Sequence, residues 1–360
     1  MLSQNNKITA RQLQILLFLN IFGIGVIALP RIVAEQAGTA YGWICVVLAT
    51  CIVLLAAFFM CYAGEHLTKP VGAVLSVFFI VRLIAGCAME ARIFGEIVRL
   101  SMLPLTPVSL ICGVLLLTAA YAVSKGYETR ARVGEILVFT SILPLLIICG
   151  MLFSKTNNLN FYELLPTEST APKNIFMGTA AAVFAFKGVE LVLLAFPYLK
   201  DSDKRHRTAG IVRTIAIIGL LMAGMTIITT ARFGEHTARL MYPTLEMLDT
   251  AEIAGAVNIE RKDALVMCFW IVSTFSLISA FLFFSVELTA NFAGGKNRKK
   301  ILLALLALSF VIAVLPRGIG EAYKINDIIN ITLGAPLLFV LPVVLAVKAF
   351  LKRRKNGKIT

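Results

Sequence analysis

The sequence predicts an all-α integral membrane protein with ten transmembrane helices, and three observations support this class. The chain has 360 residues, of which 59% are hydrophobic and only 15% charged, whereas an average soluble domain is roughly a quarter charged. Continuous apolar runs of about 20 residues, the length that a helix needs to cross a bilayer, recur along the chain. The runs do not alternate between polar and apolar residues, so the strands of a membrane barrel are not indicated.

Ten apolar runs account for the predicted transmembrane helices. The first is longer than a signal-peptide core and carries Arg31 and Glu35 at its far end, so we expect a retained helix. The predicted spans are 13–33, 42–63, 72–98, 107–124, 134–153, 175–198, 211–231, 264–288, 301–315 and 328–350.

The net charge of +14 follows the positive-inside rule rather than a nucleic-acid surface. With a cytoplasmic N-terminus, 21 of the 34 Lys and Arg residues fall in cytoplasmic segments and 10 in outer segments. Lys125, Arg130 and Arg132 are counted here as one cytoplasmic loop. We therefore expect both termini in the cytoplasm, a basic C-terminal tail held by anionic membrane lipids, and no nucleic-acid partner.

Neither a metal site nor a cofactor is predicted. The seven cysteines all lie in apolar runs without metal or redox spacing, and the three histidines fall in loops without a partner motif. The sequence also has no paired acid–base motif and no nucleophile signature, so we do not expect an enzyme.

The two halves of the chain share a pattern of interrupted helices. Gly23, Gly25 and Pro30 interrupt the first run, and Gly188 and Pro197 interrupt the sixth. Since the sixth run comes five spans after the first, the second half enters the membrane from the opposite side. This predicts a single transmembrane domain, residues 1–360, with an inverted repeat of about 13–153 and about 175–350.

Interrupted helices predict a binding site at the middle of the membrane. The freed backbone N–H and C=O groups cannot be left bare in lipid and must face a cavity, where they suit a carboxylate, an ammonium group or a cation. Glycines for close helix packing are the alternative reading. Outside the membrane, the segment 233–263 is expected to form an outer loop with a short helix, either a gate or a simple surface helix.

Ionisable residues in the third run are further candidates, because charges inside a membrane are costly. Arg82, Gly86 and Glu90 step by four and share one helix face. Glu90 either binds an ammonium group, a proton or water, or forms a buried pair with Arg82 or Lys187. Another face carries Arg92, Glu96 and Arg99, spaced for an ion-pair ladder near the membrane surface.

Five stretches resemble the endospore germination permeases, GerAB-like B subunits of germinant receptors in the amino acid–polyamine–organocation superfamily. They are "ITARQLQILLFLNIFGIGVIALPRIVAEQAG", "MEARIFGEIV", "FKGVELVLLAFPYLKD", "YPTLEMLDTAEIAGAVNIERKDAL" and "FWIVSTFSLISAF". The resemblance implies a LeuT-like fold, a small germinant such as an amino acid, and an A subunit and a lipoprotein C subunit as partners in the spore inner membrane. Glu90 and Arg92 match the family pattern, whereas Lys187 stands where the family is commonly apolar.

Lys187 lies next to Gly188 and has three possible roles: it selects a ligand with an extra negative charge, replaces a sodium ion as a fixed cation, or pairs with Glu190 or Glu90. In transporters of the resembled fold, the eighth span helps to hold a cation against the first. Here the eighth run carries hydroxyls that bind such a cation or bond back to the helix: Ser273, Thr274, Ser276 and Ser279.

Taken together, these observations predict the site residues. The predicted ligand-binding residues are Gly23, Gly25, Gly86, Glu90, Phe186, Lys187, Gly188 and Ser276, and the predicted ion-coupling residues are Ser273, Thr274 and Lys187. Two functions use the same cavity: a germinant receptor subunit that senses its ligand, and a stand-alone amino-acid permease coupled to protons or sodium.

Overall fold

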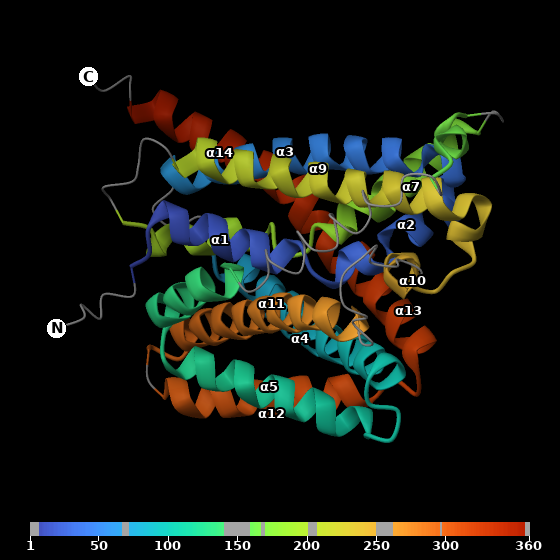
Figure 1. Ribbon diagram of the computed structural model, residues 1–360. Helices are drawn as coiled ribbons and strands as arrows, with labels where there is room; N and C mark the ends of the chain where they lie inside the picture. Colours follow the sequence, from blue (N-terminus) through green and yellow to red (C-terminus); the bar gives the residue numbers. More distant parts are fainter. Residues whose placement is uncertain are drawn as a thin grey trace.

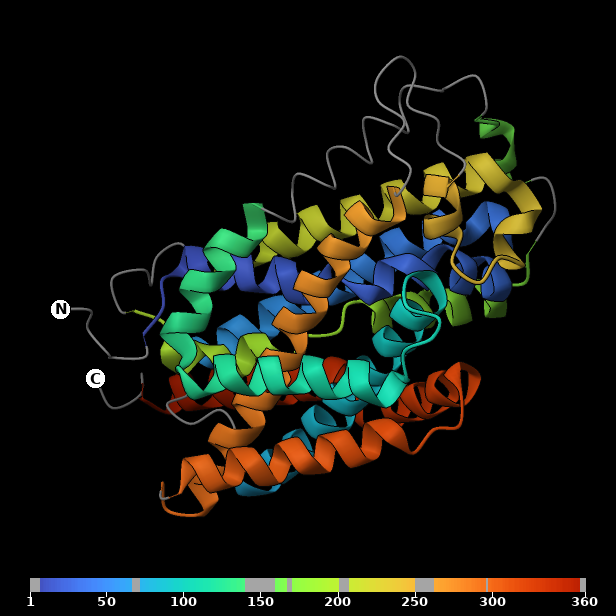
Figure 2. The ribbon, with the colours of Figure 1, turned by 60° about the horizontal axis from the view of Figure 1, so that its bottom comes forward.

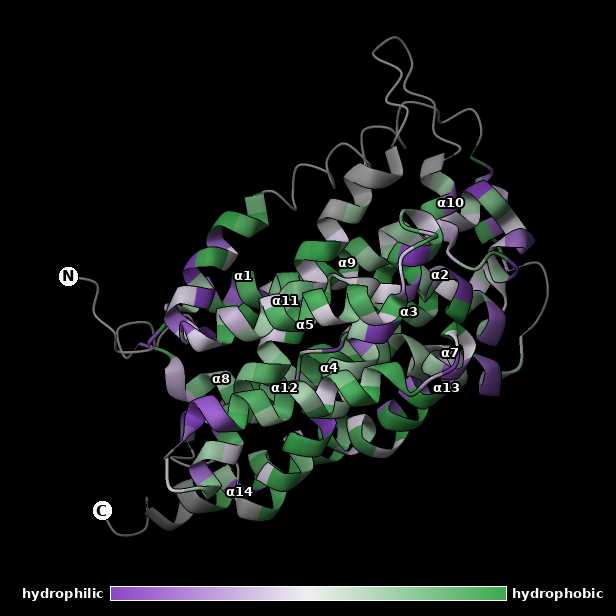
Figure 3. Ribbon diagram, turned by 90° about the horizontal axis from the view of Figure 1, so that it is seen from below, coloured by the Kyte–Doolittle hydropathy of each residue, from purple (hydrophilic) through white to green (hydrophobic). Residues whose placement is uncertain are grey.

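The computed structural model describes residues 7–66, 72–139, 159–166, 170–200, 207–249, 262–295 and 297–356. Within these ranges the chain is all-helical as predicted, and its only strand-like feature is one isolated parallel bridge between Ile8 and Leu199. Five of the described helices are long and apolar enough to cross a membrane: Thr39–Glu65, Val74–Ser101, Arg207–Ala238, Trp270–Phe292 and Ile319–Leu351. Figure 3 shows hydrophobic residues along most helices and hydrophilic residues mainly near their ends.

The first predicted span consists of two helices. α1 (Ala10–Ile21) begins at a capping box, in which the Gln12 backbone N–H donates to Thr9 Oγ1 and the Thr9 N–H donates to Gln12 Oε1. α2 (Ile24–Ala37) follows after Phe22 and Gly23 and ends at Gly38, and the segments Ala10–Ile21 and Val26–Ala37 meet at an angle of 57°. The interruption thus lies at Phe22 and Gly23, while Gly25 and Pro30, which we also expected to break the run, lie within α2.

The sixth predicted span is also divided. α7 (Pro172–Ala185) begins with proline, whose fixed φ suits the first helical turn. It ends before a stretch of turns, after which α8 (Leu191–Ala195) and the short helix η4 (Phe196–Tyr198) continue the chain. Gly188 lies between the two helices with a φ of 94°, a conformation that glycine adopts readily.

The helices form two layers (Figure 1). In one layer α4 (Ala73–Ser101) packs against α5 (Val108–Ser124), α11 (Lys262–Phe292) and α12 (Arg298–Val314). In the other, α1 and α2 pack with α7, α3 (Gly42–His66) and α9 (Arg207–Phe233). Direct contacts between α1 and α11 join the two layers.

Two further segments lie beside both layers. The last described helix starts as α13 (Ile319–Ile329), which packs on α4, and continues as α14 (Leu341–Asn356), which packs on α3. Two π-helical turns separate them, at Asn330–Gly334 and Pro336–Val340. Residues 127–139 are helical and begin directly after Gly126, whose φ is 89°; this helix is the green one that rises on the left side of Figure 2.

Several predicted boundaries differ from the structure. Helix 127–139 starts seven residues before the expected 134, because Glu128, Arg130 and Arg132 interrupt the apolar pattern without ending the helix. The last helix starts at Ile319 instead of 328, because polar residues from Tyr323 to Asp327 form its first turns. Of the outer loop 233–263, the structure describes η6 (Gly234–Ala238) and α10 (Pro243–Asp249), which packs on α2; 250–261 lie outside the described residues.

Candidate functional site

The two helix interruptions approach each other against α11. A Cβ atom added to Gly188 would lie 3.4 Å from Asn20 Cβ on α1 and 3.2 Å from Leu277 Cδ1 on α11. A Cβ added to Gly23 would lie 3.4 Å from Ser273 Cβ. The glycines at both interruptions therefore permit close contact among α1, the turn between α7 and α8, and α11.

Lys187 lies at this meeting point and joins three elements. Its Nζ donates one hydrogen bond of 3.0 Å to Glu90 Oε2 on α4 and another of 3.0 Å to Asn326 Oδ1 on α13. The Glu90 side chain is only 3% exposed, whereas that of Lys187 is 17% exposed. Of the pairings that the sequence leaves open for Lys187, the structure forms the one with Glu90.

A second ion pair lies beside the first. Arg82 Nη2 is 3.4 Å from Glu190 Oε1, and both side chains are buried. The same guanidinium donates to Asn330 Oδ1 at 3.3 Å, and Glu190 Oε2 accepts the backbone N–H of Gly188 at 3.0 Å. Glu190 therefore stabilises the turn between α7 and α8 as well as the charge on α4.

Other side chains pack closely around two of the predicted ligand-binding residues. A Cβ on Gly86 would lie 2.8 Å from Arg82 Nη1 and 2.9 Å from Phe281 Cε2, so Gly86 provides room for these two side chains. Phe186 is fully buried at the end of α7. Gly86 does share the α4 face of Glu90, as its spacing predicts, but the described side chains fill the space next to it.

The hydroxyl groups of α11 divide into two sets. Ser276 Oγ donates to Asn20 Oδ1 at 2.7 Å, and Ser279 Oγ donates to the Ser276 carbonyl at 2.9 Å. The hydroxyls of Ser273 and Thr274 are buried and make no hydrogen bond to the described residues. The expected bonds back to the helix thus form at Ser279 but not at Ser273 or Thr274.

The ion-pair ladder of α4 forms as predicted, and most of it is buried within the protein. Glu96 binds Arg92 at 2.7 Å and Arg99 at 3.0 Å. Arg92 and Glu96 are buried, and only Arg99 extends to the exposed surface. Arg92 also donates to the Ala313 carbonyl of α12 at 3.5 Å, so this ladder holds two helices of the same layer together.

Arg130 is the main residue that sequence reasoning missed. It was counted as a cytoplasmic loop charge, yet it is 4% exposed and donates to Asn20 Oδ1, Ser279 Oγ and the Ser276 carbonyl. A helical signal was present: Glu128 and Arg132 form an i,i+4 pair of 2.6 Å on the outer face. Arg130, midway between them in sequence, therefore points to the opposite face.

The α10 segment packs on α2, α9 and α11. Thr244 Oγ1 donates to the Val26 carbonyl of α2 at 3.3 Å, and Tyr242 directly precedes α10 and is buried. Burial raises the pKa of the Tyr242 phenol, and the neighbouring hydroxyl of Tyr323 and the charge of Arg31 act in the opposite direction. Tyr242 thus lies near Tyr323 of α13 and Arg31 of α2.

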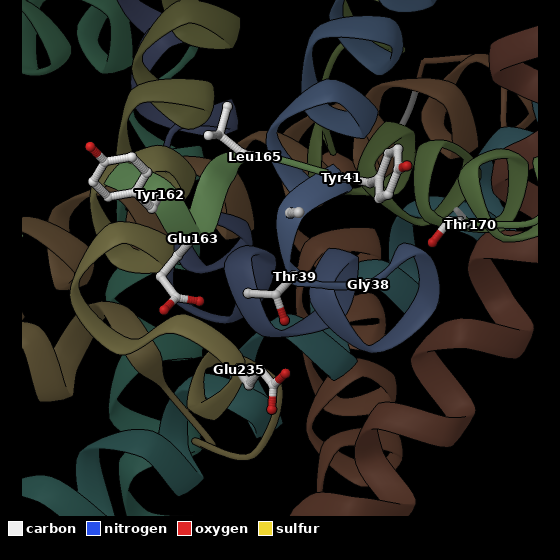
Figure 4. A pocket seen from close by; sticks show the side chains of 9 residues that line it. Gly38, Thr39, Tyr41, Tyr162, Glu163, Leu165, Thr170 and Glu235 are labelled. Atoms are coloured by element: carbon white, nitrogen blue, oxygen red, sulfur yellow. The ribbon is translucent and has the colours of Figure 1, made fainter. Parts of the chain in front are cut away.

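A cavity of about 410 Å³ lies elsewhere, where α2 ends and α3 begins (Figure 4). Glu163 and Glu235 extend toward it, and the remaining lining mixes polar, aromatic and small or apolar residues: Gly38, Thr39, Ala40, Tyr41, Tyr162, Leu165 and Thr170. None of the predicted site residues line this cavity. Among the described residues, no group of three or more His, Cys, Asp or Glu side chains is arranged to hold a metal ion.

The long apolar helices define a multi-pass membrane protein, and the arrangement of the helices is shared with a solved transporter. A solved structure with this fold is that of Mhp1, a nucleobase-cation-symport-1 family transporter, in a closed conformation with bromovinylhydantoin bound. The two superpose with a TM-score of 0.63 at 14% identity, over 97% of this chain and 79% of Mhp1.

Within this class, the chain belongs to the spore germination protein family, whose model matches residues 7–321. It is 23% identical to spore germination protein YndE of Bacillus subtilis (strain 168), over 99% of this chain and all of the relative. It is also 25% identical to protein B2 of the same organism, over 92% of both chains, and 25% identical to GerLB of Bacillus cereus, over 99% of this chain and 98% of the relative. The resemblance to germination permeases is therefore confirmed.

Proposed function

We propose that this chain is the B subunit of a germinant receptor, which binds a small germinant, an amino acid, between its two helix layers. The observation that carries this proposal is the contact of Lys187 with Glu90 and Asn326 beside Gly188. An ammonium and a carboxylate lie there at the end of two interrupted helices, in a region with little solvent. Such a pair can exchange its partners for the carboxylate and the ammonium group of an amino acid.

The proposed site contains the sequence-predicted residues. Glu90 and Lys187 bind the charged groups of the ligand, and the backbone at Gly23, Gly25 and Gly188 supplies further polar groups. Gly86 and Phe186 shape the site from behind, and Ser276 fixes Asn20 next to it. Ligand binding shifts the equilibrium between two arrangements of the layers, and the shift passes to an A subunit and a lipoprotein C subunit.

The layer composition supports the proposed architecture of ten spans in a five-plus-five inverted repeat. One layer holds α1 to α3 with α7 and α9, the first two predicted spans of each half. The other holds α4 and α5 with α11 and α12, the third and fourth spans of each half. Each layer thus contains equivalent elements from both halves, and the first and sixth spans are both interrupted. We further propose that both termini lie in the cytoplasm and that the chain lies in the spore inner membrane.

A stand-alone permease is the second candidate function. The fold shared with Mhp1 and the buried hydroxyls of Ser273 and Thr274, which make no hydrogen bond to described residues, support it. Ser273, Thr274 and Lys187 would couple transport to protons or sodium. Saturable uptake of an amino acid by vesicles that contain this chain alone would establish the permease, whereas binding without uptake would favour the receptor subunit.

A thermal-shift screen of the purified chain tests the proposed ligand class. Because a ligand that binds only the folded state raises its stability, we expect an amino acid to raise the melting temperature, and sugars and nucleosides to leave it unchanged. Lys187→Met should abolish that shift. The matched control is Lys173→Met, which alters an exposed lysine at the start of α7 and should respond like the wild type. A shift that persists in Lys187→Met, or no shift with any amino acid, would contradict the proposal.

A further inference from the structure

Arg130 is a buried cation whose hydrogen-bond acceptors are neutral oxygen atoms, and its guanidinium carbon lies 5.7 Å from the centre of the Tyr127 ring. Its Nε donates to Ser279 Oγ at 2.8 Å, and its Nη2 donates to the Ser276 carbonyl at 2.7 Å and to Asn20 Oδ1 at 3.3 Å. Within the described part of the chain, no carboxylate forms an ion pair with it. A buried charge without a counter-charge is costly, so the position of Arg130 requires an explanation beyond packing.

The oxygen atoms around Arg130 are of kinds that can bind a cation. Asn20 Oδ1 also accepts from Ser276 Oγ at 2.7 Å, and the Ser276 carbonyl also accepts from Ser279 Oγ at 2.9 Å. An amide oxygen, a main-chain carbonyl and two hydroxyl oxygens therefore converge at one place. Neutral oxygens of these kinds are the ligands that hard inorganic cations prefer, and carbonyls near interrupted helices coordinate sodium ions in secondary transporters.

The position of this cluster links the two helix layers. Asn20 belongs to the last turn of α1, while Ser276 and Ser279 belong to α11 in the other layer. Helix 127–139 supplies Arg130 from outside both layers. Asn20 also lies next to Gly188, which is the residue after Lys187. The cluster therefore contacts the turn that carries Lys187.

We propose that Arg130 is a built-in cation that holds α1 against α11, so that this contact between the layers forms without sodium or another inorganic cation. The guanidinium takes the place of the ion and uses three oxygens from the two layers. The proposal rests on these contacts and not on the identity of the germinant. It separates this chain from a sodium-coupled permease, in which the α1–α11 contact would depend on the ion.

A structural pin is the alternative role, and the response to cations distinguishes the two. If Arg130 only pins the helices, its removal lowers stability equally in every salt. If Arg130 replaces a cation, its removal leaves an oxygen cluster that a small inorganic cation can enter. Sodium should then restore part of the lost stability, whereas choline, which is too large for the cluster, should not.

The experiment measures thermal unfolding of the purified full chain in sodium, potassium or choline chloride at equal ionic strength. We expect the same melting temperature for the wild type in all three salts. Arg130→Gln should melt several degrees lower in choline and regain at least half of that loss in sodium. Arg130→Lys, which keeps a cation, should stay insensitive to the salt.

Arg132→Gln is the matched control, because Arg132 lies on the same helix in a half-exposed pair with Glu128. We expect little change and no salt specificity for it. If Arg130→Gln does not fold in choline chloride, the same test is whether folded protein is recovered in sodium chloride. The proposal is overturned if sodium stabilises the wild type over choline, or if the loss in Arg130→Gln is the same in every salt. Sodium stabilisation of the wild type would instead favour an ion at Ser273 and Thr274.

Discussion

The ammonium of Lys187 lies 3.0 Å from the carboxylate of Glu90, although 97 residues separate them in the sequence. One of these residues follows the end of α7 and the other lies within α4, so the pair joins the two layers of helices. On its other side, Lys187 donates to Asn326 of α13. The charged centre of the molecule is therefore formed by three segments that meet only in the folded state.

A double-mutant cycle on Glu90 and Lys187 measures how strongly the pair is coupled. Removing one partner leaves the other buried and unpaired, so we expect Glu90→Gln and Lys187→Met each to lower the free energy of unfolding by about 3–5 kcal/mol. The double variant should lose less than the sum of the two. Glu35→Gln is the control: its partner Arg31 is 3.5 Å away and both are partly exposed, so the loss should stay below about 1 kcal/mol. Additive losses at Glu90 and Lys187 would show that the pair is not coupled.

Gly188→Ala tests whether the turn between α7 and α8 requires glycine. The φ of Gly188 is 94°, and a left-handed conformation costs other residues roughly 1–2 kcal/mol. The added methyl group would also lie 3.2 Å from Leu277 Cδ1. We expect a lower melting temperature and a weaker response to ligand.

Gly224→Ala is the control for this substitution. Gly224 lies inside α9, and a Cβ there would meet no atom within 4 Å. Alanine is the better helix former by about 0.5–1 kcal/mol, so this variant should be neutral or slightly more stable. If the two alanine variants behave alike, the positive φ at Gly188 has no energetic consequence.

Sequence reasoning located the charged centre but could not choose its pairs. Because an isolated charge is costly inside a membrane, Glu90 and Lys187 each had to find a partner. Arg82, Glu90, Lys187 and Glu190 permit several pairings, and the choice depends on how α4 faces the turn after α7. Glu190 also accepts a hydrogen bond from the Gly188 backbone N–H. The position of this backbone group cannot be predicted from the sequence.

Arg130 shows where reasoning from hydropathy failed. A window that seeks apolar residues begins the helix after the charges of 128–132, and so assigns Arg130 to a loop. The helix nevertheless begins at residue 127, and its charges divide between an exposed face and a buried one. The buried partners are amide, hydroxyl and carbonyl oxygens, none of which has a charge that would mark them in a sequence.

Asn20→Asp tests the environment of Arg130 by adding the missing negative charge. Hydrogen bonds to a charged acceptor are worth about 1.5–3 kcal/mol, compared with about 0.5–1.5 kcal/mol for neutral ones. We therefore expect a gain in unfolding free energy of about 1 kcal/mol, measured by chemical denaturation in detergent. Asn20→Ala should be destabilised, because it removes an acceptor shared by Ser276 Oγ and Arg130. Destabilisation by both substitutions would mean that Arg130 does not accept a carboxylate partner.

Glu190 combines two functions that separate substitutions can resolve. Its Oε2 accepts the Gly188 N–H at 3.0 Å, and its Oε1 lies 3.4 Å from Arg82 Nη2. Glu190→Gln keeps an oxygen for the N–H but removes the charge, so Arg82 stays buried with Asn330 as its remaining polar partner. Glu190→Ala removes both.

We expect losses of about 3–5 kcal/mol for the glutamine variant, as for a broken buried pair, and about 1 kcal/mol more for alanine, which also loses the hydrogen bond. Replacing Arg82 with Met in the Glu190→Gln background should recover part of the loss, because no uncompensated charge then remains. Equal stability of the wild type and Glu190→Gln would show that the hydrogen bond to Gly188, and not the charge of Glu190, holds this turn in place.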